Sequence, residues 1–112
     1  MNELLITFTP DFKRDYKRLF KKYVSLNEDM KELVEKLKEN PILGTPLGNS
    51  AFKIRLAISS KNKGKSGGAR IITYFLSQEN ELYLLSIYDK SDQVNISDKS
   101  ITGLIENILE GK

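Results

Sequence analysis

The sequence contains no cysteine and no histidine among its 112 residues. Without cysteine the chain can form no disulfide, no thiolate nucleophile and no cysteine-based zinc site. Without histidine it lacks the commonest metal ligand and the side chain that most often exchanges protons near neutral pH. Any catalysis must therefore use lysine, arginine, tyrosine, aspartate, glutamate, serine or threonine, and we expect neither a metal nor another cofactor.

Long apolar runs are also missing. No stretch approaches the roughly 20 apolar residues that a membrane-spanning helix requires. The first residues do not form a signal-peptide pattern, because Asn2 and Glu3 precede only a short apolar run that Pro10 and Asp11 follow. We therefore expect a cytoplasmic protein without a membrane partner.

The composition indicates a single globular domain spanning residues 1–112. Apolar residues make up 39% of the chain and charged residues 29%, which is typical of a globular rather than a disordered protein. The net charge of +3 is a mild basic excess that is compatible with a nucleic-acid partner. The placement of the cations along the chain is more informative than their sum.

The first 41 residues predict a strand followed by two helices. Leu4–Phe8 is a short apolar run typical of a buried strand. Thr9 and Pro10 form the start of a helix, and we expect Asn27 to cap a second helix that ends at Asn40–Pro41. These two helices would form an antiparallel hairpin.

The rest of the chain predicts three strands and a final helix. Strands are expected at residues 51–59, 69–76 and 82–90, and their closeness in sequence favours an antiparallel meander. Gly67 and Gly68 would supply the positive φ angles of the first turn. Ser97 would cap the last helix. The order βααβββα therefore predicts an α+β fold, with helices packed on one face of an antiparallel sheet and the other face partly open.

Cations gather on these strands. Because strand side chains alternate, Lys53 and Arg55 must project from the face opposite to Ile54 and its apolar neighbours. Arg70 begins the next strand and would lie near both, and Lys90 ends the last strand. From Lys53 to Arg70 the chain carries six cations and no carboxylate. A patch without neutralising acids indicates a polyanionic ligand, although an ordinary solvated sheet face would use the same residue types.

Two further groups of lysines are candidates for phosphate contacts. Lys61, Lys63 and Lys65 lie on the glycine-containing connection between the first two strands of the meander, for which a flexible hairpin loop is the alternative interpretation. Lys13 and Lys17 belong to the basic side of the first helix, which is also compatible with a solvated helix surface.

Residues 52–75 read FKIRLAISSKNKGKSGGARIITYF, and residues 82–97 read LYLLSIYDKSDQVNIS. These two stretches resemble the RelE/ParE toxin superfamily and, within it, the HigB-like branch. The resemblance implies a RelE-like microbial RNase fold and the toxin half of a type II toxin–antitoxin pair. It also implies a ribosome-dependent endoribonuclease that cleaves mRNA in the A site. The partners would then be a cognate antitoxin, the ribosome and mRNA.

The resemblance also implies roles for individual residues. Carried over by position, Lys53, Arg55 and Arg70 match the basic active-site residues of the family. Lys90 matches a cation at the end of the last strand, and Tyr88 is the nearest aromatic candidate. Metal-independent attack by the RNA 2′-hydroxyl needs a base, charge stabilisation at the phosphate and an acid. Lys53 is the candidate base, and Arg70 is the candidate for binding two phosphate oxygens. Tyr88 would stack on a base or donate a hydrogen bond, and Lys90 would hold a phosphate or protonate the leaving group.

Alternatives remain at the level of the sequence. The loop and helix lysines would contact RNA or the ribosome in the nuclease interpretation. An antitoxin would cover the basic face or displace the last helix, unless that helix simply closes the core. A ParE-like DNA gyrase inhibitor would have the same fold without the catalytic cations, and a non-catalytic RNA- or ribosome-binding module is a third reading. The triplet Lys53, Arg55 and Arg70 favours the nuclease.

Overall fold

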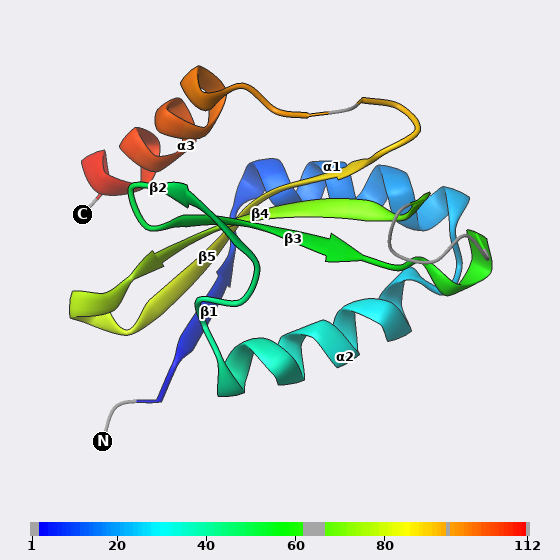
Figure 1. Cartoon of the computed structure of the whole chain (residues 1–112), viewed down its shortest axis with the longest axis horizontal. Coiled ribbons are helices and arrows are strands. Elements are labelled where there is room, and N and C mark those ends of the chain that lie inside the picture. The colour runs from blue at the N-terminus through cyan, green and yellow to red at the C-terminus, as the bar shows by residue number, and fades with distance from the viewer. Residues whose placement is uncertain (1–2, 62–66, 94, 112) are drawn as a thin grey trace.

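The computed structural model describes residues 3–61, 67–93 and 95–111. Within these ranges three α-helices and five strands form the α+β fold expected from the sequence (Figure 1). The elements are β1 (Leu5–Phe8), α1 (Pro10–Lys22), α2 (Leu26–Glu39), β2 (Thr45–Gly48), β3 (Ala51–Leu56), β4 (Ala69–Leu76), β5 (Glu81–Asp89) and α3 (Asp98–Glu110). No helix in this described part of the chain has the length and apolar character needed to cross a membrane.

The strands form one sheet in the order β1-β5-β4-β3-β2. The meander of β3, β4 and β5 is antiparallel, as its short connections predict. The sheet as a whole is mixed, because β1 pairs with β5 in parallel. This edge position also explains why β1 is not the buried strand that its apolar run predicts: Leu5 is 58% exposed.

No sequence pattern predicted β2, which lies in a segment expected to be a loop. This strand has only four residues, and one of them is Pro46. Proline cannot donate to a sheet ladder and is tolerated at an edge, which is where β2 lies, next to β3. Composition alone therefore did not distinguish this short edge strand from a turn.

Apolar side chains cover both faces of the sheet. On one face α1 and α2 pack on the strands through a cluster that includes Phe12, Leu26, Leu37, Ile54, Ile71 and Leu84. On the other face α3 contributes to a second cluster with Ile72, Tyr74, Tyr83, Leu85, Tyr88, Ile101 and Ile105. Figure 1 shows α2 and α3 on opposite sides of the strands. The second face is only partly covered, since Arg55 on β3 remains exposed there.

Two of the three helix caps predicted from the sequence are present in the structure. The Thr9 hydroxyl accepts from the Phe12 N–H at 3.2 Å, and the Ser97 hydroxyl accepts from the Ser100 N–H at 3.1 Å. The prediction that Asn27 caps α2 is wrong, because the helix begins one residue earlier, at the fully buried Leu26.

The side chain of Asn27 is used elsewhere. Its Oδ1 accepts a hydrogen bond from the hydroxyl of Tyr16 on α1. The residue at the N-cap position is Ser25, and its hydroxyl makes no capping bond. The α1–α2 contact, rather than local capping chemistry, therefore determines how these side chains are placed.

Gly68 permits a close approach of β4 to β3. The prediction that this glycine supplies a positive φ is wrong, because its φ lies outside the left-handed region. A Cβ atom at this position would lie 2.1 Å from the carbonyl oxygen of Leu56. Glycine is needed here because the backbones nearly touch, just before Arg70 enters the sheet.

Candidate active site

Strand pairing brings four of the five predicted catalytic residues onto one face of the sheet. Arg55 on β3 is in register with Arg70 on β4, and Arg70 is in register with Tyr88 on β5. Lys53 lies two residues before Arg55 and therefore projects from the same face. We call the surface formed by Lys53, Arg55, Arg70 and Tyr88 the cationic face.

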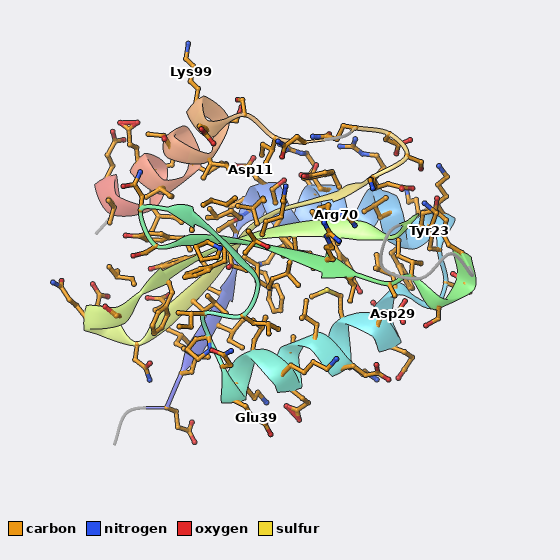
Figure 2. All side chains as sticks on the ribbon, in the orientation of Figure 1. Asp11, Tyr23, Asp29, Glu39, Arg70 and Lys99 are labelled. Carbon is orange, nitrogen blue, oxygen red and sulfur yellow. The ribbon has the colours of Figure 1, made fainter. Side chains whose placement is uncertain are left out.

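The members of the cationic face differ in depth. Arg55 is exposed and Lys53 is half-buried, whereas Arg70 is only 4% exposed. The Nη1 atom of Arg70 donates to the backbone oxygen of Ala69 at 3.1 Å. Arg70 is the second residue of β4 and lies near the end of the sheet at which this strand starts (Figure 2). The sequence predicted that these three cations lie near one another but not how deeply each is buried, and the structure has two accessible cations with Arg70 beneath them.

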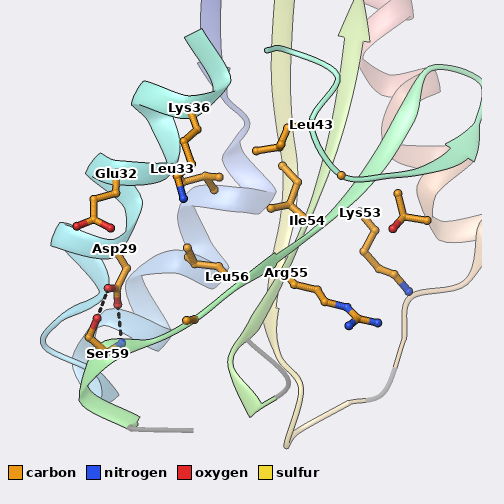
Figure 3. A pocket seen from close by; sticks show the side chains of 13 residues that line it. Asp29, Glu32, Leu33, Lys36, Leu43, Lys53, Ile54, Arg55, Leu56 and Ser59 are labelled. Atoms are coloured by element: carbon orange, nitrogen blue, oxygen red, sulfur yellow. Dashed lines mark hydrogen bonds between the residues drawn. The ribbon is translucent and has the colours of Figure 1, made fainter. Parts of the chain in front are cut away.

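Lys53 and Arg55 extend away from the helical layer. Figure 3 shows both side chains on the side of β3 opposite to α2. The Nζ atom of Lys53 lies 3.5 Å from Oδ1 of Asn95, in the segment between β5 and α3. Sequence reasoning assigned no role to Asn95. The spacing of these two residues along the chain, 42 positions, offered no local signal for the contact.

Tyr88 has a buried hydroxyl group that finds no hydrogen-bond partner among the residues that the structure describes. The side chain packs in the second apolar cluster and is 6% exposed. Burial raises the pKa of Tyr88, and the nearby charge of Arg70 acts in the opposite direction without cancelling the effect. The hydroxyl therefore stays protonated at neutral pH and can donate. An unsatisfied buried hydroxyl typically costs about 1–3 kcal/mol, and such groups are rare in folded proteins.

Lys90 is exposed in the turn that follows β5. Its backbone N–H donates to the oxygen of Gly68 at 3.1 Å, which keeps the turn beside the start of β4. The structure thus places Lys90 at the end of the sheet where Arg55, Arg70 and Tyr88 are aligned.

Lys61 does not lie where the sequence predicted. It ends the short 3-10 helix η1 (Ser59–Lys61), and its ammonium group forms a 2.7 Å ion pair with Asp89. The Lys61 side chain is only 8% exposed. Asp89 alternates with Tyr88 along β5 and so faces the helical layer. Lys61 is therefore not a free loop cation, because it is bound on the opposite side of the sheet.

Of the remaining predicted phosphate-binding lysines, the two that the structure describes, Lys13 and Lys17, are not on the cationic face. Lys63 and Lys65 lie outside the described residues. Lys13 and Lys17 are exposed on α1, and Lys13 lines a cleft of about 360 Å³ between α1 and α2 together with Phe12 and Met30. Because this cleft lies in the helical layer, Lys13 and Lys17 are separated from Lys53 and Arg55.

A second cleft borders the cationic face along the edge of β3. Its volume is about 440 Å³, and it lies between α2 and the part of β3 that β2 does not cover (Figure 3). The lining is charged with both signs, since α2 contributes Glu32 and Lys36. Lys53 and Arg55 line the same cleft, so carboxylates of α2 lie across it from the exposed edge of the cationic face.

Comparison with known proteins agrees with this architecture. A family model described as the RelE toxin of the RelE/RelB toxin–antitoxin system matches residues 12–107. A double mutant of the E. coli toxin RelE in the free state is 13% identical, with a TM-score of 0.64, and the match covers 96% of this chain and 99% of that chain. The isolated E. coli RelE toxin is 13% identical, with a TM-score of 0.59 and coverage of 94% and 98%.

The intact E. coli RelBE toxin–antitoxin complex is also similar. The identity is 15% and the TM-score 0.59, over 77% of this chain and 95% of that chain. At such identities the solved structures establish the fold. The family model covers most of the chain, from the start of α1 to the last turns of α3. The chain therefore belongs to the RelE toxin family.

Proposed function

We propose that this RelE-family chain is a ribosome-dependent endoribonuclease that cleaves mRNA in the A site without a metal. The observation that carries the proposal is the alignment of Arg55, Arg70 and Tyr88 across three strands, with Lys53 beside them. Like charges placed side by side repel each other, and an RNA phosphate would relieve that repulsion. The sequence around them contributes no acid to this face between Lys53 and Arg70.

The role proposed for each residue follows from how deeply its side chain is buried. Lys53 would accept the proton of the 2′-hydroxyl, and the 2′-oxygen would then attack the adjacent phosphorus atom. The bond from phosphorus to the 5′-oxygen would break, which leaves a 2′,3′-cyclic phosphate and a 5′-hydroxyl. Arg55, which is exposed, would contact the phosphate directly, and Arg70 would stabilise the developing charge from beneath.

Two residues are candidates for assisting the departure of the 5′-oxygen, which is the leaving group. Lys90 is exposed at the end of β5 and would hold a phosphate or donate the proton that the 5′-oxygen needs. Tyr88 keeps its proton and lies beside Arg70, so it would donate a hydrogen bond in the transition state. The stacking role predicted from the sequence does not fit a ring that is buried in the second apolar cluster. This set of acids and bases is weak. The ribosome would compensate by holding the RNA in line, since positioning contributes up to roughly 7–11 kcal/mol.

The partners follow from the family. Solved relatives include the E. coli RelBE toxin–antitoxin complex, and we expect a cognate antitoxin here as well. The ribosome and mRNA would be the other partners, which places the protein in the cytoplasm. Neither a metal nor a cofactor is required by the proposed reaction.

Primer extension on mRNA during translation tests the proposal. The purified chain should produce discrete cuts in ribosome-bound mRNA and none in free mRNA. A non-catalytic ribosome-binding module would bind without cutting, and a gyrase inhibitor would leave mRNA intact while blocking DNA supercoiling. Absence of cleavage with folded wild-type protein and translating ribosomes would contradict the proposal.

A further inference from the structure

Asp89 is a buried carboxylate on the side of β5 opposite to the cationic face. Its side chain is completely inaccessible. Oδ1 accepts hydrogen bonds from Lys61 Nζ at 2.7 Å, from the Ser91 hydroxyl at 2.7 Å and from the Ser91 N–H at 3.0 Å. Oδ2 accepts from the Tyr23 hydroxyl at 2.6 Å. We call Tyr23, Lys61, Asp89 and Ser91 the Asp89 cluster.

The Asp89 cluster joins segments that are far apart in sequence. Tyr23 follows the last turn of α1, Lys61 ends η1, and Ser91 lies in the turn after β5. The Lys61 ammonium also lies 5.3 Å from the centre of the Tyr23 ring, which adds a cation–π contact. Figure 2 shows Tyr23 at the end of α1. One carboxylate thus holds three chain segments against the end of the sheet.

A second carboxylate fastens the other end of η1. Asp29 on α2 accepts from the Ser59 hydroxyl at 2.6 Å and from the Ser59 N–H at 3.0 Å (Figure 3). The segment from Ser59 to Lys61 is therefore bound at its start by Asp29 and at its end by Asp89. This segment follows β3, the strand that carries Lys53 and Arg55.

The charges of the Asp89 cluster are permanent. Burial acts to raise the pKa of Asp89, but hydrogen bonds from Lys61, Tyr23 and Ser91 outweigh it and hold that pKa well below its usual range. Burial acts to lower the pKa of Lys61, but the hydrogen bond to Asp89 and its charge outweigh it and raise that pKa. Both groups stay ionised at any pH near neutral, so the interactions within the cluster persist and it does not act as a pH switch.

Buried ion pairs contribute little net stability compared with an apolar pair of similar size, so a role in positioning is the better explanation. Asp89 immediately follows Tyr88 and is in register with Ala69, which precedes Arg70. We propose that the Asp89 cluster is a positioning device for the candidate active site, holding the ends of β4 and β5 so that Arg70 and Tyr88 keep their places on the other face. This inference depends on the proposed nuclease function, in which a shift of about 1 Å costs up to roughly 100-fold in rate.

Two substitutions test the positioning role of the Asp89 cluster by removing one charge each. Asp89→Asn and Lys61→Met should lower the saturated cleavage rate about 10- to 100-fold, with KM within about threefold, in protein shown to be folded at the assay temperature. Lys61→Arg keeps the charge and the hydrogen bond and should restore the rate to within about threefold of wild type. Glu28→Gln is the matched control, because it removes a carboxylate from the exposed pair with Lys31. The proposal would be overturned if folded Asp89→Asn and Lys61→Met cleave at the wild-type saturated rate, whether or not their KM rises.

Tyr23→Phe gives a milder disturbance if those variants do not fold. It removes only one donor to Asp89 and keeps the ring against Lys61. Amide hydrogen exchange at Arg70 and Tyr88 should become about tenfold faster in Tyr23→Phe, while exchange in β1 stays unchanged. This measurement does not depend on cleavage, so an inactive wild-type protein would count against the nuclease proposal alone. Unchanged exchange at both amides would overturn the positioning role.

Discussion

Arg55 and Arg70 face each other in register across the β3–β4 pair, although both carry a positive charge. Like charges directly opposite each other destabilise a sheet. The arrangement is explained if a phosphate group binds between the two side chains. Arg55 is exposed and Arg70 is nearly buried, so the two guanidinium groups would contact an RNA backbone at different depths.

The unpaired hydroxyl of Tyr88 predicts a conflict between stability and activity. Tyr88→Phe should raise the free energy of unfolding by about 1 kcal/mol, because it removes a buried polar group without a partner. The same change should lower the cleavage rate at least tenfold. Urea unfolding and single-turnover cleavage measure the two effects.

Thr73→Val is the matched control for Tyr88→Phe. Thr73 is fully buried, and its hydroxyl also finds no partner in the described part of the chain. Thr73 alternates with Ile72 and Tyr74 and so faces the helical layer. Thr73→Val should raise stability by a similar amount, about 1 kcal/mol, without changing cleavage. Equal rates for Tyr88→Phe and Thr73→Val would remove Tyr88 from the active site.

The ion pair of Asp89 predicts how stability depends on pH. The folded-state pKa of Asp89 lies below its unfolded value of about 3.9, so its stabilising contribution is present above that value and is lost as the pH falls. At pH 7, Asp89→Asn should lower the free energy of unfolding by about 3 kcal/mol. The difference from wild type should stay constant down to about pH 5 and shrink below about pH 4. Urea unfolding at several pH values measures this difference in the free energy of unfolding. A difference that grows as the pH falls would contradict the lowered pKa of Asp89.

Gly68 predicts a steric requirement at the start of β4. Gly68→Ala would place a Cβ atom 2.1 Å from the Leu56 oxygen, so the strands must separate at this point. The expected cost is at least about 3 kcal/mol, comparable to other severe backbone clashes. Gly103→Ala is the control, because a Cβ atom at that position on α3 meets no neighbour within 4 Å. Equal melting temperatures for the two variants would contradict the close approach of β3 and β4.

The loop lysines predict a salt effect. Lys63 and Lys65 were assigned to RNA or ribosome binding from the sequence, and Lys61 is now excluded because Asp89 binds it. The double variant Lys63→Ala, Lys65→Ala should weaken ribosome binding and reduce the salt slope by roughly 0.7–0.9 for each lost phosphate contact. The saturated cleavage rate should stay near normal. A normal slope with a reduced saturated rate would place these lysines in the chemistry instead.

Local patterns predicted the elements that depend on local chemistry. The caps at Thr9 and Ser97 were correct, because a hydroxyl at an N-cap bonds to the backbone two or three residues away. The alternation in β3 correctly predicted that Lys53 and Arg55 face away from Ile54. These features depend on side chains within a few positions of each other along the chain.

Features that depend on distant segments were not predicted. Lys61 and Asp89 are 28 positions apart, and nothing in the neighbourhood of either residue indicates the pair. The depth of Arg70 could not be predicted either, because burial depends on how neighbouring strands and segments pack around it. An aspartate at the end of the apolar run LYLLSIYD was the one available hint, since a carboxylate in a buried strand needs partners.

Single-turnover cleavage of ribosome-bound mRNA by Arg55→Ala and Arg70→Ala tests the central claim most directly. Each variant should lose on the order of 10²–10³ in rate, as expected when one group that stabilises transition-state charge is removed. Arg14→Ala on α1, whose side chain is exposed and paired with Asp11, should cleave like the wild type. Wild-type cleavage by folded Arg55→Ala and Arg70→Ala would contradict the assignment of the cationic face as the active site.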